Sequence, residues 1–232
     1  LNQHITRMKI LAKEDGSASV EETWEEKGIW DEFYRSLYLP LKAEEREEKI
    51  TSYMSEKFPN AKIRDIIFSK LEDLEIPFKA SIKYEIRDIL GQNENLLATK
   101  SDAEFLLSEY SWSSPSDLKN DISFKRGFRR IIELSFILPE GYKAISWTRD
   151  ISMDDPLVSF GMVSKTQGNE FQISYEFVVK KNRIKKEEYS GFYQFIQEAF
   201  KRSKGMIAFE GKAKKEPVKK IDKSSAETAK TT

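Results

Sequence analysis

The chain has 232 residues, and its 39 Lys plus Arg balance 39 Asp plus Glu, so its formal net charge is zero. Hydrophobic residues make up 39% and aromatic residues 12%, which is enough to bury a substantial core and excludes an intrinsically disordered chain. The balanced charge provides no overall field that would favour a nucleic acid partner. No apolar run approaches the roughly 18 residues of a membrane-spanning helix, and the N-terminus lacks a secretory hydrophobic region.

The chain contains no cysteine and a single histidine, His4. The absence of cysteine excludes a thiol nucleophile, a disulfide and a Cys-ligated metal site. A Ser-His-Asp triad would have to recruit His4, which we expect to lie in a frayed terminal stretch, and a His-rich metal site is excluded. We therefore expect no catalytic residues, no cofactor and no bound metal. Because the sequence starts at Leu1 instead of Met, we expect a fragment of a longer protein.

Residues 1–100 are predicted to form a β-rich segment that opens with a hairpin. Residues 5–12 and 17–26 form its two strands, and Asp15-Gly16 supplies the turn. Alternation in the second strand places four side chains on one face: Ala18, Val20, Glu22 and Trp24. The aromatic-rich stretch 27–41 predicts a short helix or an irregular packed segment.

A helix is predicted at 43–58, because its apolar residues follow helical spacing: Ile50, Tyr53, Met54 and Phe58. Its acidic first turns, EEREEK, are a solvated face that suits a helix N-terminus. Strands follow at 62–70 and from residue 78 to residue 87, where apolar and polar residues alternate strictly. Gly91-Gln92-Asn93 then predicts a turn.

Residues 101–210 are predicted to form a β-sandwich portion that ends with a helix at 188–203. The predicted strands span 121–125, 129–138, 142–149, 158–165, 169–181 and 205–209. The Lys-rich residues 211–232 are predicted to be a disordered tail. The pattern therefore indicates an α+β fold that is mainly antiparallel β and β-sandwich-like, with two amphipathic helices.

The stretch FILPEGYKAISW, residues 136–147, predicts a corner between two strands. Pro139 ends the first strand because its ring removes a backbone donor, and Gly141 supplies the backbone freedom of the turn. Tyr142 then returns to the core. A ligand-contacting loop is the minority alternative at this position.

The order of three segments resembles the C-terminal region of large bacterial transglutaminase-like proteins. The segments are LEDLEIPFKASIKYEI, then DLKNDISFKRGFRRIIELSFILPEGYKA, then SFGMVSKTQGNEFQISYEFVVKKNRIKKEEYSGFYQFIQEAF. The opening MKILAKEDGSASVEETWEEKG also resembles the segment that follows the catalytic domain in that family, so the resemblance covers about residues 5–210. The segment WTRDISMDDP departs from the family's pattern after its GY strand.

The resemblance implies a non-catalytic accessory domain that packs on, or presents substrate to, a transglutaminase-like domain expected upstream. The family's Cys-His-Asp set matches no position here, because the chain has no cysteine. The resemblance also implies a parent protein that is exported to the periplasm or cell surface. The alternative is an independent module that binds a carbohydrate or a peptide.

The candidate binding loop is the long connection 101–120, where Tyr110, Trp112 and Pro115 would form an exposed aromatic patch. Burial of these residues at a sheet edge is an equally good interpretation. Asp154 and Asp155, with Asp150 nearby, could be paired carboxylates for acid–base chemistry or a cation site, but a solvated turn before a strand is favoured.

Overall fold

The computed structural model describes residues 2–100, 107, 115–124, 126–146 and 150–211. The predicted α+β fold, mainly antiparallel and sandwich-like, is confirmed. The helices are α1 (Ile29–Tyr38), α2 (Ala43–Lys57) and α4 (Tyr189–Ser203), with short 3₁₀ helices η1 (Pro115–Asp117) and η2 (Lys186–Glu188). The strands of the N-terminal part are β1 (Gln3–Ala12), β2 (Ala18–Lys27), β3 (Ala61–Phe68), β4 (Phe78–Ile86), β5 (Gly91–Asn93) and β6 (Leu96–Lys100). The later strands are β7 (Ile122–Ser123), β8 (Phe128–Ile137), β9 (Lys143–Ser146), β10 (Ile151–Asp154), β11 (Val158–Gln167), β12 (Glu170–Val179), β13 (Arg183–Ile184) and β14 (Met206–Glu210).

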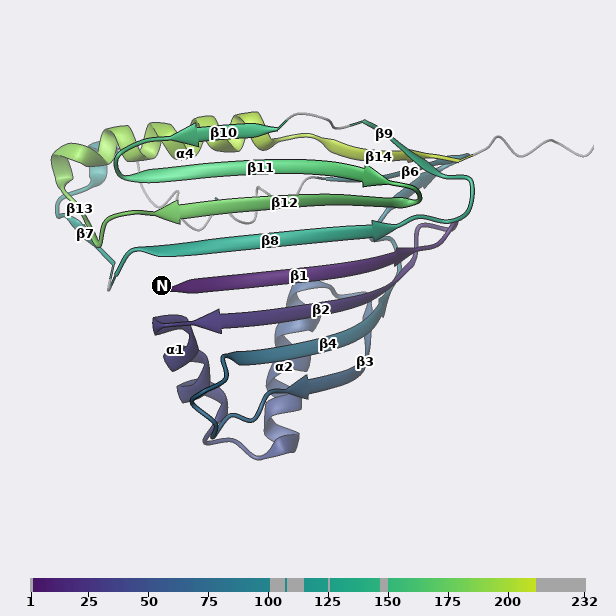
Figure 1. Ribbon diagram of the computed structural model, residues 1–232, viewed down its shortest axis with the longest axis horizontal. Coiled ribbons are helices and arrows are strands. Elements are labelled where there is room, and N and C mark those ends of the chain that lie inside the picture. Colours follow the sequence, from purple (N-terminus) through teal and green to yellow (C-terminus); the bar gives the residue numbers. More distant parts are fainter. Residues whose placement is uncertain (1, 101–106, 108–114, 125, 147–149, 212–232) are drawn as a thin grey trace, which may run out of the picture.

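One large sheet dominates the structure (Figure 1), with the strand order β10-β11-β12-β8-β1-β2-β4-β3. All its neighbouring strands are antiparallel except β1 and β8, which pair in parallel. This parallel pair joins the hairpin at the start of the chain to strands that lie more than a hundred residues later. A four-stranded sheet, β5-β6-β14-β9, forms a second layer.

The two faces of the large sheet differ in burial. On the inner face, every second residue of β4 and β12 is buried, as the alternation predicts. This face packs against α1 and α2 at one end and against α4 and the four-stranded sheet at the other, where Phe209 contacts Phe136 and Phe171. The opposite, outer face carries charged and polar side chains together with apolar ones such as Leu11 and Val163, and in Figure 1 both α2 and α4 lie behind the sheet.

Helix α1 is locked in place by a buried cation. The Arg35 guanidinium pairs with Asp31 at 2.8 Å and donates to the backbone carbonyls of Leu71 and Ile76. Because Arg35 is buried, these acceptors remove the penalty of desolvating its charge. The clamp therefore fixes where α1 lies against the inner face.

The LPEGY corner is confirmed. Strand β8 ends at Ile137, the backbone N–H of Tyr142 donates to Pro139 at 3.1 Å, and Gly141 has a positive φ of 85°. Tyr142 is buried, as the sequence predicts.

One local prediction is wrong. Residues 91–93 form strand β5, and the turn lies one step later, with Glu94 at φ 53°. Pairing of β5 with β6 overrides the local turn signal there. The turn predicted at Asp154-Asp155-Pro156 is confirmed, since β10 ends at Asp154 and the next strand, β11, begins at Val158. The tail 212–232 lies outside the described residues.

Candidate functional site

The predicted binding loop is mostly outside the described residues. Tyr110 and Trp112 belong to that part, and Pro115 begins η1 and is half-buried. The aromatic patch therefore stays a prediction.

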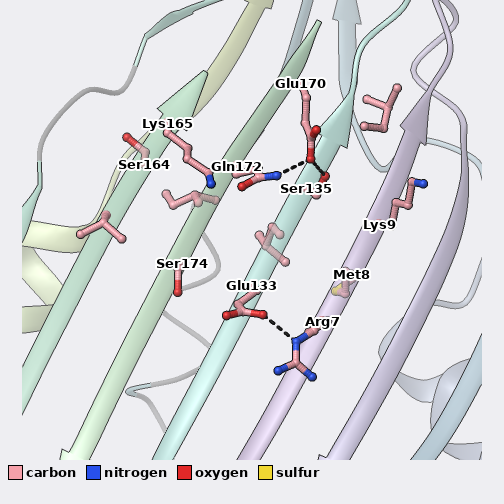
Figure 2. A pocket seen from close by; sticks show the side chains of 14 residues that line it. Arg7, Met8, Lys9, Glu133, Ser135, Ser164, Lys165, Glu170, Gln172 and Ser174 are labelled. Atoms are coloured by element: carbon pink, nitrogen blue, oxygen red, sulfur yellow. Dashed lines mark hydrogen bonds and ion pairs between the residues drawn. The ribbon is translucent and has the colours of Figure 1, made fainter. Parts of the chain in front are cut away.

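A wide hollow lies on the outer face of the large sheet. It has a volume of about 680 Å³ and is open along one side. Its walls come from four neighbouring strands: β1, β8, β12 and β11. Figure 2 shows the reason for the hollow, because the short side chains Ser135 and Ser174 lie between longer ones. We call this hollow the outer groove.

The rim of the outer groove carries both signs of charge. Arg7 Nε donates to Glu133 at 2.7 Å, and Arg7 also pairs with Glu25 at 3.0 Å. At the other end, Glu170 accepts hydrogen bonds from Ser135, at 2.6 Å, and from Gln172. These bonds hold the pKa of the Glu170 carboxyl below its ordinary value. The groove therefore combines hydrogen-bonded charged groups at its rim with apolar side chains such as Ile137 and Val163, a mixture that suits an extended protein surface.

Beside the groove, the Glu25 carboxylate is surrounded by three cationic side chains. Burial acts to raise its pKa, but hydrogen bonds from Lys27 and Arg7 and the charge of Lys79 together lower it to about 2. Its carboxylate contacts these three cations at 3.0 to 3.4 Å. This network orders the long side chains at the centre of the outer face.

His4 was expected in a frayed stretch, and this prediction is wrong. His4 lies in β1, between β2 and β8, so its backbone belongs to a central strand. Its Nδ1 lies 2.8 Å from Glu26 Oε2, and its Nε2 lies 3.3 Å from Thr6 Oγ1. An acyl-transfer site also needs donors aimed at an oxyanion, and the backbone around Thr6 already belongs to the β1 ladders. The Thr6–His4–Glu26 chain is a set of part-buried hydrogen bonds on the inner face.

Two buried carboxylates, Glu22 and Glu26, were not among the predicted site residues, although alternation places Glu22 on the face of Trp24. Glu22 and Glu26 are fully buried on the inner face, although glutamate in a strand usually faces water. Burial raises the pKa of Glu26, and the neighbouring His4 and Arg130 oppose that rise. The alternation of β2 could have revealed them, because Glu22 and Glu26 lie on the same face of the strand as the apolar residues Val20 and Trp24.

The aspartates near residue 150 each have a local structural role. The Asp154 carboxylate accepts a hydrogen bond from Lys180 Nζ at 2.5 Å. The Asp155 carboxylate accepts from the backbone N–H of Leu157 at 2.9 Å, and the Asp150 carboxylate accepts from the backbone N–H of Ser164 at 3.2 Å.

Within the described residues, no group of three or more His, Asp or Glu side chains could hold a metal ion. In the same part of the chain, no helix is both long and apolar enough to cross a membrane.

Residues 102–209, just under half of the chain, match the family described as a domain of unknown function with a solved structure (DUF3858). Comparison with curated proteins finds no match. A crystal structure of a protein from Parabacteroides distasonis, named a "putative protease", matches 49% of this chain with 16% identity and a TM-score of 0.39. The match spans only 23% of that protein. A similarity this low identifies neither the fold nor the activity of the present chain.

Proposed function

We propose that the chain is a non-catalytic accessory domain of a transglutaminase-like protein, and that its outer groove docks on the neighbouring enzyme domain. The observation that carries this proposal is the asymmetry of the large sheet. Its inner face is covered by helices and a second sheet, whereas its outer face holds an open groove of about 680 Å³ with an ordered polar rim. A rigid sheet with a face that no other described element covers offers a ready docking surface.

The family context supports the same proposal. The order of the sequence segments resembles the region that follows the catalytic domain in bacterial transglutaminase-like proteins. Residues 102–209 match a domain family without an assigned function, which is consistent with an accessory role. Acyl transfer through a thioester needs a thiolate, and the chain has no cysteine to supply one.

The test compares the chain alone with the chain joined to the transglutaminase-like domain expected upstream. The proposal predicts no amine incorporation and no peptide cleavage by the chain alone. It also predicts that the joined protein unfolds at a higher temperature than either separate part, because docking stabilises the folded states. Turnover by the repurified chain would contradict the non-catalytic role. Unchanged unfolding temperatures would contradict docking and favour an independent peptide- or carbohydrate-binding module.

A further inference from the structure

A second cavity lies on the inner face of the large sheet, on the side opposite the outer groove. It has a volume of about 400 Å³, and strands β8, β1 and β2 form its floor. Side chains of α1 and α2 form its walls. This volume falls within the range of small-molecule binding sites. We call it the inner pocket.

The walls of the inner pocket are mainly aromatic. The Trp24 ring lies 5.4 Å from the Tyr53 ring and 6.4 Å from the Tyr34 ring. On another side, the Trp30 ring lies 5.8 Å from the His4 ring. Burial raises the pKa of the Tyr34 hydroxyl, so this wall stays neutral. Walls of this kind favour a flat ring that stacks on them or meets them edge to face.

The first carboxylate of the inner pocket, Glu22, is fully buried and already has its partners. It accepts hydrogen bonds from three side chains: Trp24 at 2.8 Å, Tyr84 at 2.9 Å and Lys57 at 3.1 Å. An ammonium ligand would have to displace one of these donors, and the displaced donor would then be left unpaired in a buried place. Glu22 therefore offers no free site for a cation.

The remaining charges of the floor are also engaged within the chain. Glu26 pairs with His4 at 2.7 Å. Arg130 lies close enough to oppose the rise in the Glu26 pKa, and it has further contacts of its own. A carboxylate ligand would therefore find no unpaired cation here. Any ionised ligand would lose its hydration in the pocket without gaining an ion pair, which is unfavourable.

We propose that the inner pocket binds a neutral aromatic ring, which packs against the aromatic walls above a floor whose charges are already paired. This proposal is independent of docking through the outer groove. The same chemistry occurs in a free neutral aromatic compound and in the side chain of a phenylalanine within a peptide.

The first test uses three probes with the same ring and different head groups: phenylacetamide, phenylacetate and 2-phenylethylamine. Isothermal titration of the full chain is expected to show phenylacetamide binding at least about tenfold more tightly than either ionised probe, because only the amide enters without an unpaired charge. Cyclohexylacetamide, which is neutral but not flat, should bind several-fold more weakly than phenylacetamide. Equal affinity for neutral and ionised probes, or no binding of phenylacetamide at millimolar concentration, would overturn the proposal.

N-acetylphenylalaninamide distinguishes the two sources of the ring. It is neutral and carries a peptide group on both sides of the aromatic residue. It binds at least as tightly as phenylacetamide if the pocket receives a side chain of a peptide, and it is excluded if the pocket receives a free compound.

Two partly exposed tyrosines provide matched variants. Tyr53→Ala removes a wall of the inner pocket and is expected to lose at least about fivefold in affinity for phenylacetamide. Tyr193→Ala removes the same side chain from α4, away from the pocket, and should keep the affinity. An equal loss in both variants, or unchanged affinity in the Tyr53 variant, would contradict the proposal.

Tryptophan fluorescence gives a second measurement that does not depend on a variant. Because Trp24 and Trp30 line the inner pocket, phenylacetamide should change the emission of the wild-type chain over the same concentration range as the heat of binding. Heat of binding without any change in emission would place the ligand elsewhere and contradict the proposal.

Discussion

Ile5 of β1 lies opposite Ile131 of β8 in a parallel register, and both side chains are buried although they belong to the outer face. This pair sits at the seam where the two parts of the chain join into one sheet. Because the pairing runs from Gln3 to Leu11, nearly the whole length of β1, the two parts share a continuous ladder of hydrogen bonds. Their stabilities are therefore coupled.

We predict that the described part of the chain unfolds in one transition. Ile131→Asp places a charge at the seam and should lower the free energy of unfolding by about 3 kcal/mol or more. Val163→Asp, on the same face but exposed, should change it by no more than about 0.5 kcal/mol. Urea unfolding followed by circular dichroism and by tryptophan fluorescence would measure both effects. Two separate transitions would contradict the coupling.

Glu22→Gln tests the buried carboxylate of the inner face. The variant keeps the shape of the side chain but removes the charge that Lys57 pairs with, so unfolding should become easier by roughly 1–3 kcal/mol. Glu21→Gln is the matched control, because Glu21 is exposed on the opposite face of β2. Thermal unfolding of the two variants measures the difference, and equal stabilities would show that the Glu22 contacts contribute nothing.

Glu25 should make stability depend on pH in the acidic range. Its pKa is about 2 in the folded state, against an ordinary value of 4.5, so the unfolded chain takes up the proton first as pH falls. Its contribution is complete above pH 4.5 and is lost as pH falls toward 2. Between these values, wild-type stability should fall more steeply than that of Glu25→Gln. Urea titrations at several pH values test this, and parallel slopes would contradict it.

Gly28→Ala is predicted to be more destabilising than Gly168→Ala. Both glycines have positive φ, 67° and 62°, which disfavours alanine by about 1 kcal/mol. A Cβ on Gly28 would also lie 2.3 Å from Asn2 Oδ1, whereas a Cβ on Gly168 meets nothing within 4 Å. Asn2 in turn accepts from the N–H of Ile29, at the start of α1. The melting temperatures of the two variants measure this difference. An equal fall in melting temperature would show that the clash with Asn2 does not contribute to stability.

Much of the fold could be predicted because burial repeats with the period of the element. Strands β4 and β12 alternate strictly, and α2 and α4 carry apolar stripes, so local pattern and final burial agree. Strand β10 also alternates, with Ile151 and Met153 more buried than Ser152 and Asp154, but four residues are too short a pattern to predict a strand without its pairing with β11. The parallel pairing of β1 with β8 is equally invisible in the sequence, because no local signal encodes a partner so distant along the chain.

The candidate sites were harder to predict than the fold, because their residues come together only through pairing between distant segments of the chain. Alternation placed Glu22 on the face of Trp24, but only the assembled sheet shows that α2 covers this face and that Lys57 reaches Glu22. His4 acquires its partners from the pairing of β1 with two other strands. The outer groove depends on four strands from different parts of the chain, so no single stretch of sequence could predict it.

Titration of the chain with the separately purified transglutaminase-like domain that we propose upstream tests docking through the outer groove most directly. Ser174→Arg fills the groove with a long side chain, whereas Ser81→Arg places the same side chain on the outer face beyond it. We predict measurable binding of the wild-type chain, at least about tenfold weaker binding of the Ser174 variant, and unchanged binding of the Ser81 variant. No binding by the wild-type chain, or equal binding by both variants, would contradict docking through this groove.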